Sequence, residues 1–126
     1  MIQKGTRLSV IDNSGVKMVC CIHIHGYRNR YAKVGDILVV SVRSLKIKRK
    51  NSAKLKKGDV CKAIVVRTKK ILVDFSVRNF QFLTNDVVLL SRQNKILSNR
   101  IFGVIPNNFR FSKFLKLISL SAGFII

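Results

Sequence analysis

The sequence predicts a mainly β protein, built as a small closed barrel of about five short strands and followed by two short helices. Two observations carry this prediction. Short β-branched runs recur along the first three quarters of the chain, separated by Gly and Asp. The pattern then changes after Arg100, where a lone proline precedes helical spacing of apolar residues. Closing short strands into a barrel removes their exposed edges.

The first two expected strands flank a turn. Residues 8–10 alternate in polarity and lead into Asp12-Asn13-Ser14-Gly15, whose side chains favour a turn. Residues 16–24 then read as the second strand. Ile and His alternate over residues 22–25, as in a half-buried strand.

Two Gly-Asp pairs begin the next two strands. Gly35-Asp36 precedes residues 37–42, and Gly58-Asp59 precedes residues 60–66. We expect the two pairs to form equivalent corners of one meander, with each Asp binding nearby backbone groups.

The cationic residues 46–57 between these strands form a loop or a protruding ribbon. Residues 71–82 alternate irregularly, and residues 87–90 form a last apolar strand.

Two short helices are expected at the C-terminus. Pro106 can open a helical turn over residues 107–111, and Ser112 can cap a second helix. In that second helix Phe114, Leu117 and Ile118 follow i, i+3, i+4 spacing, so one apolar face would pack on the barrel.

Length and net charge indicate the number of domains and the kind of binding partner. The chain has 126 residues, 48% of them hydrophobic, and a formal net charge of +20 from 25 Lys and Arg against 5 acids, all Asp. One domain is expected, with the barrel and ribbon over residues 1–97 and a helical segment over residues 98–126. Such a charge predicts a polyanionic partner, with nucleic acid favoured over an anionic membrane surface.

Catalytic and metal-binding chemistry have little support. Five scattered Asp residues do not form the carboxylate cluster of a metal-dependent nuclease, and no nucleophile signature occurs. His23 and His25 face the same side of a strand, but Cys20, Cys21 and Cys61 show no metal-ligand spacing. We therefore expect no enzyme, no metal and no cofactor, with reduced thiols.

Cations concentrate in residues 43–70, where Asp59 is the only acid. Arg67, Lys69 and Lys70 follow the expected strand at residues 60–66. A lysine offers a mobile point charge and an arginine a planar pair of donors, so these side chains could bind phosphates. The alternative is that they are simply solvated at the end of the strand. The loop before Gly35 mixes cations with tyrosines, which suits RNA, although Tyr31 could instead cap the barrel. The RNA contacts predicted from these residues are Arg28, Arg30, Tyr31, Lys33, Lys46, Lys48, Arg49, Lys50, Lys54, Lys56, Lys57, Arg67, Lys69 and Lys70.

These features coincide in order with one known family. The matching segments are Met1-Ile2-Gln3, Asp12-Asn13-Ser14-Gly15, Arg30-Tyr31-Ala32, Val34-Gly35-Asp36-Ile37, Lys56-Lys57-Gly58-Asp59, Lys62-Ala63, residues 65–70, Val88-Leu89-Leu90, Arg100-Ile101-Phe102-Gly103, Lys113-Phe114 and Ile118-Ser119-Leu120. On these segments the chain resembles the universal large-subunit ribosomal protein fourteen, of the bacterial and organellar type. The resemblance spans the whole chain at nearly constant spacing.

The resemblance implies a fold and a set of partners. The expected fold is a five-stranded barrel with a protruding β-ribbon and two short C-terminal helices. The expected partners are large-subunit rRNA, small-subunit rRNA across an intersubunit bridge, and the neighbouring large-subunit protein nineteen. No catalytic role is implied. The matched segments add Arg100 and Lys113 to the candidate rRNA contacts.

The chain also departs from the family pattern. Residues 74–78 lack the Pro-Asp-Gly turn usual in the ribbon, which predicts a wider turn there. The richness in Phe, Ile, Asn and Lys is typical of an AT-rich organellar genome, so we expect an organelle-encoded protein of the mitochondrial ribosome; plastid and bacterial ribosomes are the alternatives.

The main alternative function is a free barrel-type single-strand RNA-binding or translation factor. Such a protein would need a row of exposed aromatic side chains on one sheet face. The phenylalanines lie after residue 74, where packing accounts for them. A peripheral membrane protein would need a longer basic amphipathic helix than this C-terminus offers.

Overall fold

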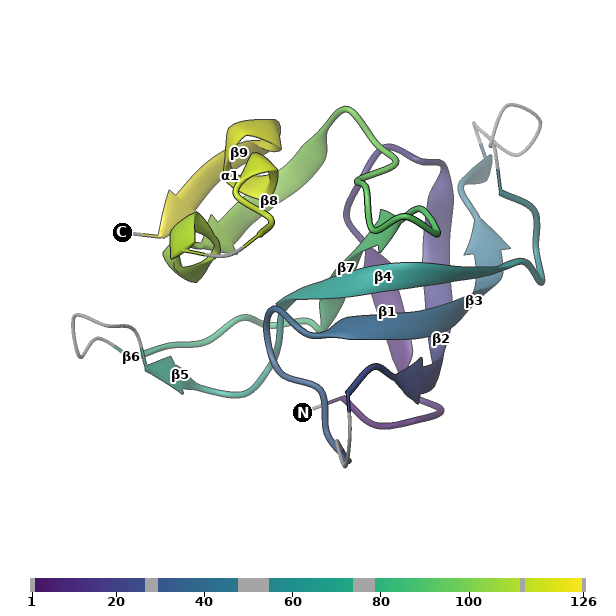
Figure 1. Cartoon of the computed structure of the whole chain (residues 1–126), viewed down its shortest axis with the longest axis horizontal. Helices are drawn as coiled ribbons and strands as arrows, with labels where there is room; N and C mark the ends of the chain where they lie inside the picture. Colours follow the sequence, from purple (N-terminus) through teal and green to yellow (C-terminus); the bar gives the residue numbers. More distant parts are fainter. Residues whose placement is uncertain (1, 27–29, 48–54, 74–78, 112, 126) are drawn as a thin grey trace.

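Five strands close into a barrel in the computed structural model of the chain (Figure 1). The structure describes residues 2–26, 30–47, 55–73, 79–111 and 113–125. The barrel strands are β1 (Arg7–Val10), β2 (Val16–Ile24), β3 (Ile37–Leu45), β4 (Val60–Arg67) and β7 (Asp86–Leu90). They confirm the barrel predicted from the sequence, with ends that differ from the expected ones by up to three residues.

Consecutive barrel strands pair antiparallel, and one parallel contact closes the sheet. β2 pairs with β1 and β3, and β4 pairs with β3 and β7. β1 and β7 run parallel, with Ser9 opposite Asp86 and Val10 opposite Val87. β1 is therefore held by the last barrel strand, β7, and these five described strands close without a free edge.

The barrel interior is filled by alternate residues of each strand. Leu38, Val40 and Val42 of β3 point inward and are buried, while their neighbours in the strand are partly exposed. β4 and β7 differ because Ala63-Ile64-Val65-Val66 and all five residues of β7 are buried. Continuous apolar runs of this kind indicate strands covered on both faces.

The C-terminal segment covers the outer faces of β4 and β7. β8 (Ile101–Pro106) pairs in parallel with β9 (Ser121–Ile125), and between them lie a 3₁₀ helix, η2 (Asn107–Phe111), and a short α-helix, α1 (Lys116–Leu120). Phe109 of η2 and Leu117 of α1 are buried against Ile64 and Val88 on the outer side of the barrel. Figure 1 shows this segment set against the barrel beside β4 and β7.

Of the two expected helices, the first is the 3₁₀ turn η2 and the second is the five-residue helix α1, and a parallel strand pair accompanies them. Pro106 ends β8, and η2 begins at the next residue and covers the predicted helical turn over residues 107–111. The second helix begins at Lys116, after Leu115 as its N-cap residue; the expected cap, Ser112, lies outside the described residues. The parallel strand pair was not predicted, because its partners lie some twenty residues apart and carry no regular alternation.

A two-stranded ribbon leaves the barrel between β4 and β7. It consists of β5 (Leu72–Val73) and β6 (Asn79–Phe80), which pair antiparallel, and it projects away from the barrel in Figure 1. The wide turn predicted at residues 74–78 lies outside the described residues. Residues 48–54, expected to be a loop or ribbon, also lie outside them.

The simple alternation predicted at residues 22–25 is wrong at one position. Ile24 is buried, but Ile22 is 45% exposed. The pairing of β2 with β3 shifts register between Cys21 and His23. A bulge of this kind inserts an extra residue into one strand and reverses the side to which the following residues point.

Candidate nucleic-acid interface

The two Gly-Asp corners have the same internal geometry. An Asp36 Oδ2 oxygen accepts a hydrogen bond from the Lys33 N–H at 2.8 Å, and Asp59 Oδ2 accepts one from the Lys56 N–H at 2.8 Å. In each corner a glycine precedes the Asp, and the φ angles are 93° at Gly35 and 91° at Gly58. The predicted equivalence of the corners is confirmed. Each corner fixes a lysine backbone at the barrel end while the side chain stays exposed.

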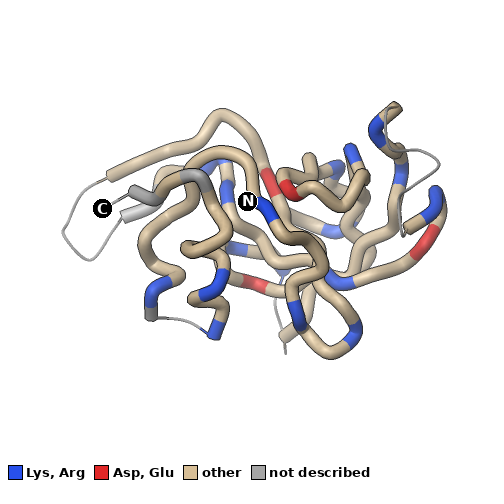
Figure 2. Tube along the Cα trace, turned by 90° about the horizontal axis from the view of Figure 1, so that it is seen from above, with Lys and Arg blue, Asp and Glu red and all other residues tan. Residues whose placement is uncertain are grey.

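The two other described acids are buried inside the fold. Asp12 accepts hydrogen bonds from the N–H groups of Leu89, at 3.0 Å, and Ser14, at 3.1 Å. Asp86 accepts a hydrogen bond from the Thr84 hydroxyl at 2.6 Å. Four of the five acids therefore hold turns and strands together, and the outer surface carries the basic residues. Figure 2 shows Lys and Arg on several sides of the trace and few acids among them.

Arg67 occupies an internal site. Its Nε lies 3.0 Å from Asp86 Oδ2, and its Nη2 donates a hydrogen bond to the Phe102 carbonyl at 3.2 Å. Only 18% of its side chain is exposed. The guanidinium therefore joins β4, β7 and β8. The predicted contact of Arg67 with a phosphate stays a prediction. In this structure the guanidinium is directed toward Asp86 and the Phe102 carbonyl.

Lys69 and Lys70 continue beyond β4 and are exposed. The Lys69 backbone is fixed on both sides, because its N–H donates to Asn85 Oδ1 at 2.9 Å and its carbonyl accepts a hydrogen bond from the Gln81 amide at 2.7 Å. This strand end presents cations from an anchored backbone.

Two predicted cations that lie far apart in the sequence meet at one aromatic ring. The Lys46 Nζ lies 5.0 Å from the centre of the Phe102 ring, and the Arg100 guanidinium carbon lies 5.3 Å from the same centre. Phe102 is 41% exposed. Cations attract the face of an aromatic ring, so the ring holds both side chains near the surface. Phe102 was not among the predicted site residues, although it lies in the segment Arg100-Ile101-Phe102-Gly103 on which the resemblance rests.

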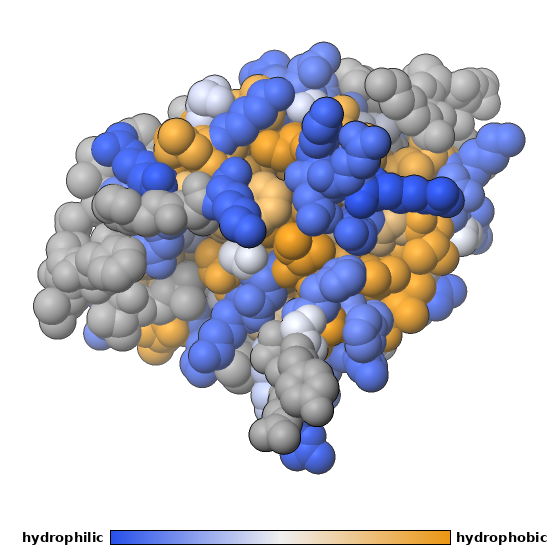
Figure 3. Space-filling view, in the orientation of Figure 1, coloured by the Kyte–Doolittle hydropathy of each residue, from blue (hydrophilic) through white to orange (hydrophobic). Residues whose placement is uncertain are grey.

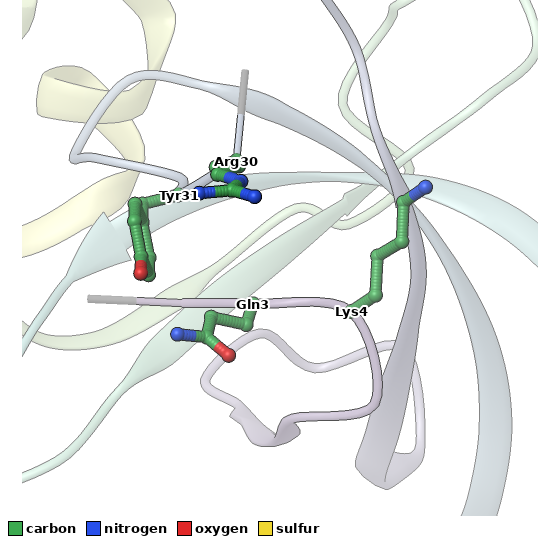
Figure 4. A pocket seen from close by; sticks show the side chains of 4 residues that line it. All are labelled: Gln3, Lys4, Arg30 and Tyr31. Carbon is green, nitrogen blue, oxygen red and sulfur yellow. The ribbon is translucent and has the colours of Figure 1, made fainter. Parts of the chain in front are cut away.

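Arg30 and Tyr31 meet the N-terminal segment. Together with Gln3 and Lys4 they line an open cavity of about 410 Å³ (Figure 4). All four side chains are exposed. Gln3 and Lys4 were not predicted as site residues, because nothing local in the sequence connects them with residues 30 and 31.

Lys113 lies near two further cations. It lines a second cavity, of about 250 Å³, with Lys95 and Lys116. Lys33, Lys56 and Lys57 are exposed at the barrel ends. Five predicted contacts lie outside the described residues, namely Arg28, Lys48, Arg49, Lys50 and Lys54.

The cations among the described residues lie on several sides of the trace. On the face shown in Figure 3, hydrophilic side chains are spread over several elements with apolar surface between them. A distribution of this kind suits contact with several strands of a surrounding polyanion more than one groove for a single strand.

The thiols and imidazoles show no sign of metal chemistry within the described parts of the chain. Cys20, Cys21 and Cys61 are free, and no cluster of three metal-ligating side chains occurs among the described residues. Burial raises the pKa of the Cys21 thiol, and burial together with the charges of Asp12 and Asp59 raises that of Cys61 to about 11. Thiols of this kind are poor ligands and nucleophiles near neutral pH. In the same parts of the chain, no helix has the length and apolar character needed to cross a membrane.

The closed barrel and its exposed cations define a basic scaffold protein, and a surface of this kind is typical of proteins that bind polyanions. The comparison with known families makes this specific. The model of the family described as ribosomal protein L14p/L23e matches residues 1–125, so the chain belongs to this family. Members are structural proteins of the large ribosomal subunit and are not enzymes.

Proposed function

We propose that this chain is a structural rRNA-binding protein of an organellar large ribosomal subunit, placed at the interface with the small subunit. The observation that carries the proposal is that the described acidic side chains are engaged in contacts within the fold, whereas most of the described basic side chains are exposed. The described acids are committed to turns and to the Arg67 ion pair, whereas lysines such as Lys33, Lys56 and Lys69 are exposed on fixed backbone.

The mechanism is electrostatic and geometric. Each exposed cation that neutralises a phosphate releases condensed counterions, and the rigid barrel sets the spacing between these cations. Contacts with phosphates position a protein on RNA without reading base sequence. RNA shape then selects the binding site, as it does for most folded RNA helices.

The proposed partners are large-subunit rRNA, small-subunit rRNA across an intersubunit bridge, and large-subunit protein nineteen. The family supports the ribosome as the location. The composition, rich in Phe, Ile, Asn and Lys, supports the mitochondrial ribosome over the plastid or bacterial one.

Salt titration of RNA binding tests the mechanism. The isolated protein should bind a large-subunit rRNA fragment with a log–log salt slope of about 0.7–0.9 for each phosphate neutralised. Lys57→Ala and Lys69→Ala should each lower the slope by about one such step and leave thermal unfolding unchanged. A flat salt response of the unmodified protein would refute electrostatic rRNA binding.

Sedimentation tests the location. After lysis of purified mitochondria, the tagged protein should co-migrate with large subunits in a sucrose gradient and shift to intact ribosomes under subunit-joining conditions. Recovery only near the top of the gradient, as a free protein, would favour the translation-factor alternative.

A further inference from the structure

The cavity at the N-terminal end of the barrel has a composition suited to one nucleotide. It is lined by Gln3, Lys4, Arg30 and Tyr31, so two cations, one amide and one aromatic ring face one space of about 410 Å³. Pockets that hold small ligands measure about 300–1,000 Å³. Among the described residues, the lining includes no acid that would repel a phosphate.

The backbone beneath this cavity is fixed by pairing between two distant segments. The Ala32 N–H donates to the Ile2 carbonyl at 2.8 Å, and the Ile2 N–H donates to the Ala32 carbonyl at 3.4 Å. Both residues are fully buried. The four lining residues therefore extend from a two-sided bridge that sets their relative positions.

A turn holds the Lys4 side of the cavity. The Gln3 N–H donates to the Thr6 hydroxyl at 3.1 Å, and the Gly5 N–H donates to the Cys21 carbonyl at 2.7 Å. These bonds anchor the turn to β2. The long Lys4 side chain stays exposed, so its ammonium group can reach a phosphate without any change in the fold.

The side chains are arranged around the space in complementary positions. In Figure 4 the Tyr31 ring and the Lys4 side chain lie on opposite sides, and the Arg30 guanidinium and the Gln3 amide lie between them. Tyr31 is 42% exposed, which leaves ring surface for a planar ligand. Arginine supplies a planar donor fork for a phosphate, and an amide can both donate to and accept from a base edge.

We propose that this cavity, named here the N-terminal pocket, binds one unpaired nucleotide of rRNA. The base stacks on Tyr31, its edge meets the Gln3 amide, and the flanking phosphates lie against Lys4 and Arg30. A paired base cannot bind in this way, because its faces are stacked inside the helix. The inference rests on the proposed rRNA binding and adds to it a preference for unpaired RNA.

Two RNA probes with equal numbers of phosphates separate the pocket from general electrostatic binding. One is a hairpin with an unpaired loop, and the other is a blunt duplex. Tyr31→Leu should lower the ratio of hairpin affinity to duplex affinity by about fivefold or more, because it removes the stacking surface. Tyr31→Phe keeps the ring and should restore the ratio.

Lys57→Ala is the matched control, since Lys57 is an exposed cation that does not line the pocket. It should weaken both probes by the same factor. Equal weakening of both probes by Tyr31→Leu overturns the pocket and leaves rRNA binding intact. Absence of salt-dependent binding of either probe by the unmodified protein overturns the proposed function itself.

Cross-linking of the unmodified protein gives a second readout that needs no variant. A hairpin with 4-thiouridine in its loop should cross-link to peptides that contain residues 3–4 or 30–31. Cross-links confined to other peptides would overturn the proposal.

Discussion

The Nε of Arg67 lies 3.0 Å from Oδ2 of Asp86, in an ion pair that is largely withdrawn from solvent. Arg67 ends β4, and Asp86 begins the neighbouring β7. The same guanidinium reaches the Phe102 carbonyl in β8. One charged side chain thus connects the barrel to the C-terminal segment, at a point where the sequence predicted a phosphate contact or a solvated strand end.

Loss of Arg67 should destabilise the fold. Arg67→Ala leaves the Asp86 carboxylate buried without its partner, which costs about 3 kcal/mol of unfolding free energy. Urea denaturation of the isolated protein measures this loss. The double variant Arg67→Met with Asp86→Leu removes both charges and should recover most of the loss. A change below about 0.5 kcal/mol in Arg67→Ala would show that the ion pair contributes nothing measurable.

Gly103 is expected to couple to the same ion pair. Its φ is 83°, and an added Cβ would lie 3.0 Å from Arg67 Nη1. Gly103→Ala should therefore lose about 1–2 kcal/mol from backbone strain and a further amount from displacement of the guanidinium. Gly58→Ala is the control, because its φ is 91° and nothing lies within 4 Å of the added Cβ.

A double-mutant cycle separates the two contributions of Gly103→Ala. In the Arg67→Ala background its cost should fall to that of Gly58→Ala, since the crowded side chain is gone. Additive losses in the two backgrounds would contradict the coupling.

Asp12 should stabilise the barrel through the Leu89 amide. Asp12→Ala leaves the buried Leu89 N–H without its acceptor and should lower the unfolding free energy by about 2 kcal/mol. Hydrogen exchange at Leu89 should accelerate accordingly. Asp59→Ala, at an exposed corner, is the comparison and should have the smaller effect. Equal losses in both variants would argue against the role of burial.

The Cys61 thiol should make stability fall at alkaline pH. Its pKa is raised from 9.0 to about 11 in the folded state, with burial as the main cause. The unfolded chain releases this proton first, so the contribution is fully present below pH 9 and is lost as the pH rises to about 11. Burial raises the pKa of Cys21 as well, which acts in the same direction.

Chemical denaturation between pH 8 and pH 11, compared with Cys61→Ala, isolates the Cys61 contribution because the other titrating groups are shared. The difference in unfolding free energy between the two proteins should shrink or reverse as the pH rises. A difference that stays constant across this range would remove Cys61 from the pH response.

Local sequence patterns by themselves determined the barrel strands, their turns and the class of protein. The β-branched runs at residues 37–42, 60–66 and 87–90 and the two Gly-Asp corners predicted barrel strands and their turns, because strand and turn formation depend on neighbouring residues. Charge and composition predicted the polyanion-binding class, and the order of the short segments predicted the family.

Tertiary structure alone decided how distant residues combine. It paired Arg67 with Asp86, brought Lys46 and Arg100 to the Phe102 ring, joined β8 to β9, and brought Gln3 and Lys4 to Arg30 and Tyr31. The physical reason is that such contacts depend on strand register and on how a whole segment packs, and neither is encoded in the spacing of nearby residues. A lysine or arginine read from sequence can therefore be a surface cation or an internal partner, and the fold distinguishes the two.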